Sequence, residues 1–300
     1  MAAFAAIFFV PMMMKVLILS SFFIWCISCQ QVLDQNSKIS IDNQGQTEQL
    51  KNDTTFRLIW HFKEAFSKTE QALLKKWVSQ VHEATMETLG QYQFDVHYYF
   101  YRSKGQEPVP FAHTSRGNNE MAVHFYVNTN YPLADFLADW TAPHEISHLS
   151  IPAVGKQNKW FSEGYATFLS RQVMMTMGYY TLESSNTYNL DKISAQLNAF
   201  VDDDRSMLVQ IDSLFQAHQY PAAYWGGCTY FYTIDQTLRK NYQSSLMAIV
   251  QRYQTTFRLK DLGLMPVIHS FDHILDDSLF LMTYHAYKSQ SALKILNQFQ

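Results

Sequence analysis

The stretch Pro143-His144-Glu145-Ile146-Ser147-His148-Leu149 decides how the rest of this 300-residue chain is interpreted. Two histidines four residues apart on a helix lie one turn above each other, so the imidazoles of His144 and His148 point the same way. This spacing offers two nitrogen ligands to a zinc ion from one rigid element. Glu145 follows the first histidine directly, where its carboxylate can reach a water at the metal without ligating the ion. The stretch predicts a metal-binding helix; the alternative is a pair of ordinary histidines on a helix face.

A second block, Trp160-Phe161-Ser162-Glu163-Gly164-Tyr165-Ala166-Thr167-Phe168, begins after a short spacer. Fourteen residues separate His148 from Glu163. Pro152 and Gly155 within this spacer suit a short loop that connects two helices. Two histidines and a downstream glutamate form the donor set of many catalytic zinc sites. Taken alone, Glu163 has a second interpretation, since carboxylates are common near the starts of helices.

The two blocks together resemble the gluzincin zinc metallopeptidases (peptidase MA-like), above all the catalytic domain of the aminopeptidase N family, whose second helix reads W-x-x-E-G-[FY]-A. This resemblance implies that His144, His148 and Glu163 bind Zn²⁺. It also implies that Glu145 acts as general base and acid when water attacks a peptide carbonyl. The spacer is shorter than in that family, and Thr167 stands where thermolysin-like enzymes carry an aspartate.

Two further segments resemble the same family. Tyr224-Trp225-Gly226-Gly227 is similar to its Y-x-x-G segment, which implies that Tyr224 stabilises the oxyanion; Tyr220 is the fallback, and core packing is the other interpretation of Tyr224. Gly117-Asn118-Asn119-Glu120-Met121 partly matches its G-x-M-E-N motif. That match implies that Glu120 pairs with the α-ammonium group of a substrate and that the enzyme is an aminopeptidase. An endopeptidase is the alternative.

The pattern of apolar residues predicts an α+β fold, in which a mixed α/β part carrying the HExxH helix precedes a helical part. The resemblance implies that this fold is zincin-like (thermolysin-like), with subdomains at residues 54–159 and 160–300. A helix is expected between Ser67, its cap, and Gly90, its end. The other expected elements are strands at 55–62, 94–101 and 121–127, a loop between the last two strands, and helices at 161–177, 190–200, 222–241, 244–253 and after 271.

The N-terminal residues 1–28 have the anatomy of a secretory signal, with Lys15 preceding a short apolar run. Cys26-Ile27-Ser28-Cys29-Gln30 is similar to the lipobox of bacterial lipoproteins, with Cys29 as the lipidated residue. A plainly cleaved signal and an uncleaved anchor are the alternatives. Residues 29–53 are expected to form a flexible tether. We therefore expect an exported protein of the bacterial cell envelope or periplasm, anchored to the membrane through Cys29.

Composition argues against nucleic-acid binding and for a folded globular domain. A net charge of −3 gives no electrostatic footprint for nucleic acid, and a hydrophobic fraction of 47% is ample for a sizeable core. Beyond the N-terminal segment the chain has one cysteine, Cys228, which we expect to be a small core residue.

The sequence thus predicts an exported zinc metallopeptidase of the HExxH-x14-E type that acts on a peptide or protein substrate. The alternative from another class is a catalytically silent, peptidase-like surface lipoprotein that binds a peptide or a partner protein. Glu145 favours the enzyme, because binding zinc needs only the three ligands whereas hydrolysis also needs a base.

Overall fold

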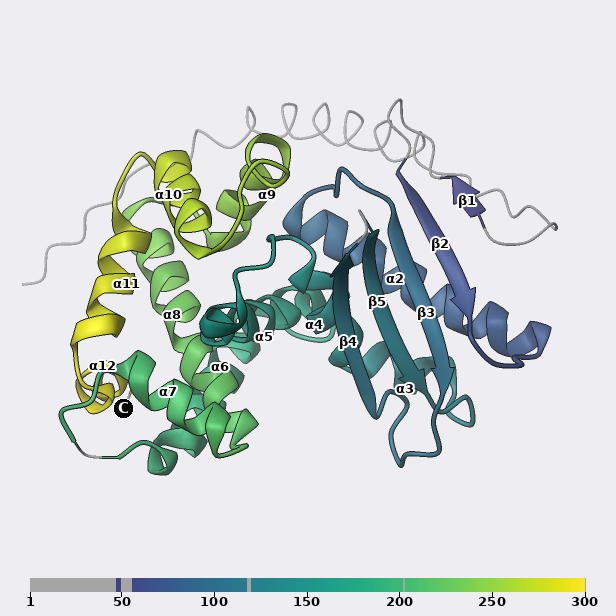
Figure 1. Ribbon diagram of the computed structural model, residues 1–300, viewed down its shortest axis with the longest axis horizontal. Helices are drawn as coiled ribbons and strands as arrows, with labels where there is room; N and C mark the ends of the chain where they lie inside the picture. Colours follow the sequence, from purple (N-terminus) through teal and green to yellow (C-terminus); the bar gives the residue numbers. More distant parts are fainter. Residues whose placement is uncertain (1–46, 50–55, 118–119, 202, 300) are drawn as a thin grey trace, which may run out of the picture.

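The computed structural model describes residues 47–49, 56–117, 120–201 and 203–299, and Figure 1 shows their arrangement. The predicted secretory signal, Cys29 and most of the predicted tether lie outside the described residues. Within the described ranges, no helix has the length and apolar character that crossing a membrane requires.

A five-stranded sheet occupies one side of the molecule, with the strand order β1-β2-β3-β5-β4 (Figure 1). The strands are β1 Thr47–Gln49, β2 Arg57–Phe62, β3 Val96–Arg102, β4 Phe111–Gly117 and β5 Glu120–Val127. The central pairs β2–β3 and β3–β5 are parallel, whereas both outer pairs are antiparallel. Parallel neighbours need a long crossover, and helix α2 (Lys68–Leu89) supplies it between β2 and β3.

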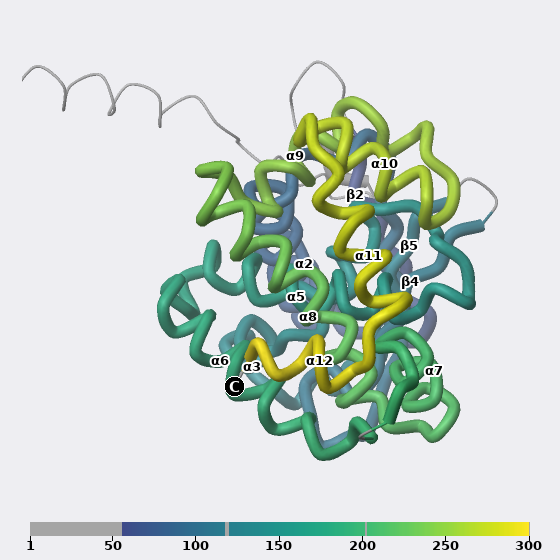
Figure 2. The backbone as a smooth tube through the Cα atoms, turned by 90° about the vertical axis from the view of Figure 1, so that its left-hand side faces the viewer, coloured from purple at the N-terminus to yellow at the C-terminus, as the bar shows by residue number. Residues whose placement is uncertain are grey.

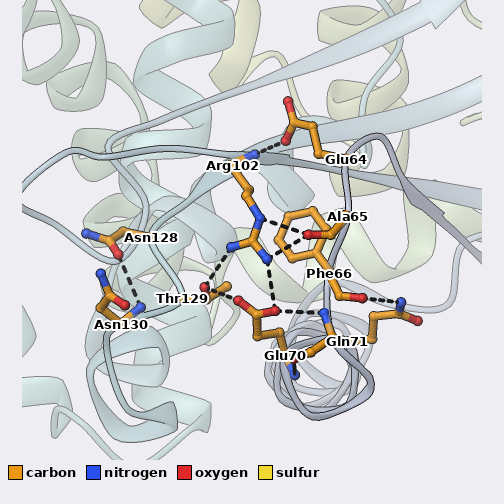
Figure 3. Close-up of polar contacts among 10 residues, drawn as sticks. Glu64, Ala65, Phe66, Glu70, Gln71, Arg102, Asn128, Thr129 and Asn130 are labelled. Atoms are coloured by element: carbon orange, nitrogen blue, oxygen red, sulfur yellow. Dashed lines mark hydrogen bonds and ion pairs between the residues drawn. The ribbon is translucent and has the colours of Figure 1, made fainter.

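Helix α2 begins and ends where the sequence predicts. Ser67 Oγ accepts from the backbone N–H of Glu70, and the Glu70 carboxylate accepts from the backbone N–H of Ser67, which is a capping box. Gly90 follows the last turn with φ of 90°. Figure 3 shows Arg102, at the end of β3, and Thr129 both donating to the Glu70 carboxylate. These hydrogen bonds, Arg102 first, hold the pKa of Glu70 well below its usual range and tie the sheet to the start of α2.

The two faces of the sheet differ in character. In Figure 1 helix α2 runs behind the sheet, and buried aromatic side chains such as Trp60, Trp77 and Phe125 fill the space between them. On the other face four rings form a row across the strands: His61, Tyr99, His124 and His113, which are partners in register. Successive ring centroids lie 4.2, 4.6 and 4.5 Å apart.

Helices make up the remainder of the chain. They are α3 Leu133–Ala138, α4 Thr141–His148, α5 Lys159–Thr176, α6 Leu182–Gln196, α7 Met207–Gln216, α8 Tyr220–Asn241, α9 Leu246–Thr256, α10 Leu264–Leu275, α11 Leu279–Ser289 and α12 Ala292–Leu296, with short 3-10 turns η1 Lys156–Asn158, η2 Leu197–Ala199 and η3 Asn297–Phe299. The predicted α+β class is therefore confirmed. Strand β4 replaces part of an expected loop, and α3, α7 and the first part of α10 have no counterpart among the expected helices. Helix α6 covers 182–196, where the expectation was a helix at 190–200. Cys228 is a buried core residue, as expected, and it forms no disulfide within the described residues.

The described residues form two hydrophobic cores that meet beside α4 and α5. Helix α4 packs Ala142, Ile146 and Leu149 into the core of the sheet and α2. Helix α5 packs Trp160 and Phe161, among others, into the core of the later helices. The two helices contact each other directly (Figure 1). The HExxH motif and Glu163 therefore lie on opposite sides of the boundary between the two cores.

Candidate metal centre

Helix α4 is only 8 residues long, and long-range donors satisfy its C-terminal carbonyl groups. The Arg116 guanidinium, from β4, donates to the carbonyl oxygen of His148. Arg258 Nε donates to Leu149 O at 2.9 Å, and Gln254 Nε2 donates to Ser150 O at 2.7 Å. The last carbonyls of a helix have no partner within the helix, so a buried helix end needs such donors. They fix the turn that carries the second histidine.

Three ligand atoms of His144, His148 and Glu163 form a compact triangle. The two histidine Nε2 atoms lie 3.2 Å apart. Glu163 Oε2 lies 3.3 Å from His144 Nε2 and 3.5 Å from His148 Nε2. Ligands of a tetrahedral zinc ion at about 2.0–2.1 Å from the metal are about 3.3 Å from one another. The donor set and its spacing are therefore those of a zinc site, and no other group of three such donors occurs among the residues that the structure describes.

The electrostatics of the triangle also fit a cation. Burial lowers the pKa of His148, but the Glu163 and Glu145 carboxylates outweigh this effect and the net shift is upward. Burial raises the pKa of Glu163, but the two histidines outweigh it and bring the pKa well below its usual range. The negative Glu163 carboxylate thus favours a positive charge beside the two histidines, and a metal ion held by the three donors would supply it.

Two glycines bring the second and third motifs together. Helices α5 and α8 cross with backbone against backbone, since a Cβ on Gly164 would lie 2.2 Å from the carbonyl carbon of Gly227. A Cβ on Gly227 would lie 2.2 Å from the carbonyl oxygen of Trp160. No side chain fits at either position, and the close crossing places Tyr224, near the start of α8, beside Glu163 on α5.

The predicted catalytic groups lie at the cluster. Glu145 is buried, and its Oε2 accepts a hydrogen bond from Thr114 Oγ1 at 3.1 Å. The Tyr224 ring stacks on the His144 ring with centroids 6.0 Å apart. Burial, and after it the Glu163 and Glu145 carboxylates, raises the pKa of Tyr224, so the phenol stays neutral and can donate. Tyr220, the fallback, is 44% exposed.

The outer nitrogens of the two histidines have different surroundings. His148 Nδ1 lies 3.2 Å from Ser162 Oγ, which can fix the orientation of this ring. His144 Nδ1 is buried without a hydrogen-bond partner among the described residues. Thr167, at the position where thermolysin-like enzymes carry an aspartate, also has a buried hydroxyl without a partner among the residues described.

The structure does not bring Glu120 to the cluster. Thr114 and Arg116 on β4 face α4, whereas Glu120 on β5 lies on the other face of the sheet with His124. Its Oε1 accepts from Tyr99 Oη at 2.6 Å and lies 3.5 Å from His97 Nδ1. The interpretation of Glu120 as the partner of an α-ammonium group at the metal therefore has no support from this placement.

Sequence reasoning missed the donors that hold α4, namely Thr114, Arg116, Gln254 and Arg258. Three of them contact residues that lie 31, 104 and 109 positions away in the chain. No local spacing marks such residues, so only the fold reveals them.

No protein-family model and no curated protein matches the chain. Among solved structures, the M1 zinc metallopeptidase from Deinococcus radiodurans is similar at 13% identity and a TM-score of 0.49, over 82% of this chain and 51% of that chain. A mutant of that enzyme bound to a Tyr-Ser-Ala substrate is similar at 12% identity and a TM-score of 0.49, over 85% and 52%. In fold, the chain is similar to M1 zinc metallopeptidases. It spans about half the length of these structures, and the case for its function rests on the side chains of the site.

Proposed function

We propose that this protein is a zinc-dependent peptidase. The observation that carries the proposal is the triangle of His144, His148 and Glu163, with separations of 3.2, 3.3 and 3.5 Å and with Glu145 and Tyr224 beside it. A site that only stores or binds a metal needs the three ligands. A buried carboxylate and a neutral phenol next to them can serve as the general base and the oxyanion donor of peptide hydrolysis.

The chemistry follows from the charge of each group. Bound zinc supplies a positive charge that activates water and polarises the carbonyl of the substrate. Glu145 takes the proton from the attacking water and passes it to the leaving amine. Thr114 keeps the Glu145 carboxylate in one orientation through its hydrogen bond. Tyr224 donates to the carbonyl oxygen as negative charge develops there.

The direct test compares wild type with Glu145→Gln. We expect the variant to keep zinc, measured by metal analysis, and to lose about 10²–10⁴-fold in turnover of a fluorogenic peptide, because the amide cannot accept the proton. Glu87→Gln, an exposed carboxylate on α2, is the matched control and should keep both properties. Equal turnover in wild type and Glu145→Gln would contradict the proposal, and a zinc-loaded wild type without turnover would favour the silent binding module.

Cleavage at free N-termini is the narrower form of this proposal, supported by the sequence similarity around Glu120 and not by its placement. Peptides with free and acetylated N-termini separate the two cases. An aminopeptidase cuts only the free form, and Glu120→Gln then lowers kcat/KM for it. An endopeptidase cuts both forms, and Glu120→Gln changes neither.

We further propose, from sequence alone, that the fold is zincin-like with subdomains at 54–159 and 160–300, and that the protein is exported and anchored through Cys29. The mass of the protein extracted from membranes tests the anchor. A mature chain that begins at Cys29 with a covalent lipid supports it. A protein recovered without lipid from the soluble fraction contradicts it.

A further inference from the structure

Arg171, two turns beyond Glu163 on α5, is a buried cation without a counter-charge. The residue is 6% exposed. Among the residues that the structure describes, no ion pair involves Arg171. Within the described part of the chain its Nε has no hydrogen-bond partner, and the guanidinium makes one weak hydrogen bond, from Nη1 to the sulfur of Met174 at 4.0 Å. A buried charge in this situation normally has a partner of opposite sign.

Two aromatic rings border the guanidinium. Arg171 Cζ lies 3.7 Å from the ring centroid of Tyr188 and 4.3 Å from that of Tyr180. Both tyrosines are half-buried, so they separate the guanidinium from solvent. Such contacts stabilise a cation, but they leave the N–H groups at the edge of the guanidinium without acceptors.

Neutral polar side chains without partners lie on the same helices. Ser185 and Asn189 on α6 are fully buried, and none of the described residues gives a hydrogen-bond partner to the Ser185 hydroxyl or to either polar atom of the Asn189 amide. They share a helix face with Tyr188, since the three positions are spaced i, i+3 and i+4. Thr167, one turn before Arg171 on α5, has an unpartnered buried hydroxyl as well.

The connection between α5 and α6 holds the two helices that carry these groups against each other. Gly178, with φ of +84°, ends α5 in a Schellman motif, in which Tyr179 N donates to Met174 O and Gly178 N donates to Met175 O. Thr181 then starts α6 with a capping box. This short turn folds α6 back against α5, and Figures 1 and 2 both show the two helices side by side.

We propose that the space between α5 and α6 is a binding site for a small anion: chloride, or the carboxylate or phosphate group of a small molecule. Arg171 supplies the counter-charge, and the Ser185 hydroxyl, the Asn189 amide nitrogen and the Thr167 hydroxyl supply neutral donors. Water molecules could satisfy the hydroxyl and amide groups, but water cannot neutralise the guanidinium. A guanidinium edge flanked by such donors is the usual arrangement for binding a compact anion.

The test is thermal unfolding of the full-length, zinc-loaded protein at constant ionic strength, with bulky gluconate replaced stepwise by chloride, acetate or inorganic phosphate. A ligand that binds only the folded state raises the midpoint with its concentration. We expect saturable stabilisation by at least one of the three anions, and its identity distinguishes a halide from an oxyanion. In Ser185→Ala the anion concentration that gives half of the stabilisation should rise about tenfold, the equivalent of one lost hydrogen bond.

Arg171→Met should abolish the dependence on the anion, whereas Arg205→Met, at an exposed arginine paired with Asp203, should keep it. A midpoint that is indifferent to all three anions, or that responds equally in Arg171→Met, overturns the proposal. Crystals of the wild type soaked separately in bromide, acetate and inorganic phosphate give an answer that does not need the variants to fold. An anomalous bromide peak or oxyanion density beside the Arg171 guanidinium supports the site, and water alone between Arg171 and Asn189 in all three soaks overturns it.

Discussion

At the scale of single residues, the metal centre depends on how each carboxylate is held. Glu163 has both histidines within 3.5 Å, and Glu145 has a hydroxyl donor, Thr114. The Glu163 carboxylate is therefore held by charge and the Glu145 carboxylate by a hydrogen bond. In the proposed mechanism Glu145 accepts and returns a proton, which needs an orientation that persists when its charge changes, and the hydrogen bond from Thr114 would hold that orientation.

Replacing Thr114 with valine keeps the shape and removes this hydrogen bond. A hydrogen bond to a charged group contributes about 1.5–3 kcal/mol, so we expect kcat/KM for a peptide to fall about 10-fold or more while zinc content stays unchanged. Ser115→Ala is the matched control, because the Ser115 side chain lies on the other face of the sheet against His124. Equal losses in the two variants would contradict the positioning role of Thr114.

His82 makes stability depend on pH. It is fully buried with Nδ1 2.7 Å from Tyr98 Oη, and burial lowers its pKa to about 4. The unfolded chain protonates a histidine near pH 6.5, so the contribution of neutral His82 is fully present above about pH 6.5 and is lost as the pH falls toward 4. The loss is on the order of 3 kcal/mol. Urea unfolding across this range should show a shallower pH dependence in His82→Gln than in wild type, and identical slopes would contradict the assignment.

At the scale of secondary-structure elements, close contacts between helices explain two sequence motifs. The glycine after Glu163 and the second glycine after Trp225 are the positions at which α5 and α8 touch. Helix α8 can then carry Tyr224 to the metal centre while both helices stay in one core. The glycines therefore serve the packing of the helices, and Glu163 and Tyr224 lie close to them in the sequence.

Gly164→Ala should lower the free energy of unfolding by about 3 kcal/mol, because the new methyl group meets backbone atoms that cannot move aside. Gly117→Ala is the control, since a Cβ at Gly117 would meet nothing within 4 Å. Chemical denaturation of the two variants measures the difference. A Gly164→Ala protein as stable as wild type would show that the helices do not cross at this contact.

Arg258 links the end of α4 to the segment just after α9. Arg258→Met removes the donor to Leu149 O and leaves a buried carbonyl unpaired, which costs about 1–3 kcal/mol of stability. Because Leu149 follows His148 directly, zinc affinity should fall as well. Arg252→Met, at an exposed arginine on α9, should change neither unfolding nor zinc affinity. Unchanged zinc affinity in Arg258→Met would contradict the expected link between the end of α4 and the metal site.

Elements with capping residues or regular apolar spacing were predictable from the sequence, whereas elements without them were not. The capping box at Ser67 and the glycine at Gly90 mark α2 within the sequence itself. Strand β4 has no such mark, because Pro110 precedes it and its second half, Thr114 to Arg116, is polar. It is an edge strand whose residues contact α4 on one face and His124 on the other. The three ligands were predictable from their spacing, but the donors around them come from distant parts of the chain.

At the scale of the whole molecule, the metal site lies where two hydrophobic cores meet. One core holds the HExxH helix and the sheet, and the other holds Glu163 and the later helices. A metal ion bound by ligands from both cores would stabilise their association, because it binds the folded arrangement and not the separated parts. One bound ion would then stabilise the fold as well as serve the proposed reaction.

The most direct measurement is zinc K-edge X-ray absorption of the purified wild-type protein, combined with its metal content. We predict one zinc ion per chain with a first shell of two imidazole nitrogens and carboxylate oxygen at about 2.0–2.1 Å, and loss of the stoichiometric zinc in His148→Ala. A protein without stoichiometric zinc, or with a first shell that lacks imidazole, would contradict the assignment of His144, His148 and Glu163 as the metal ligands.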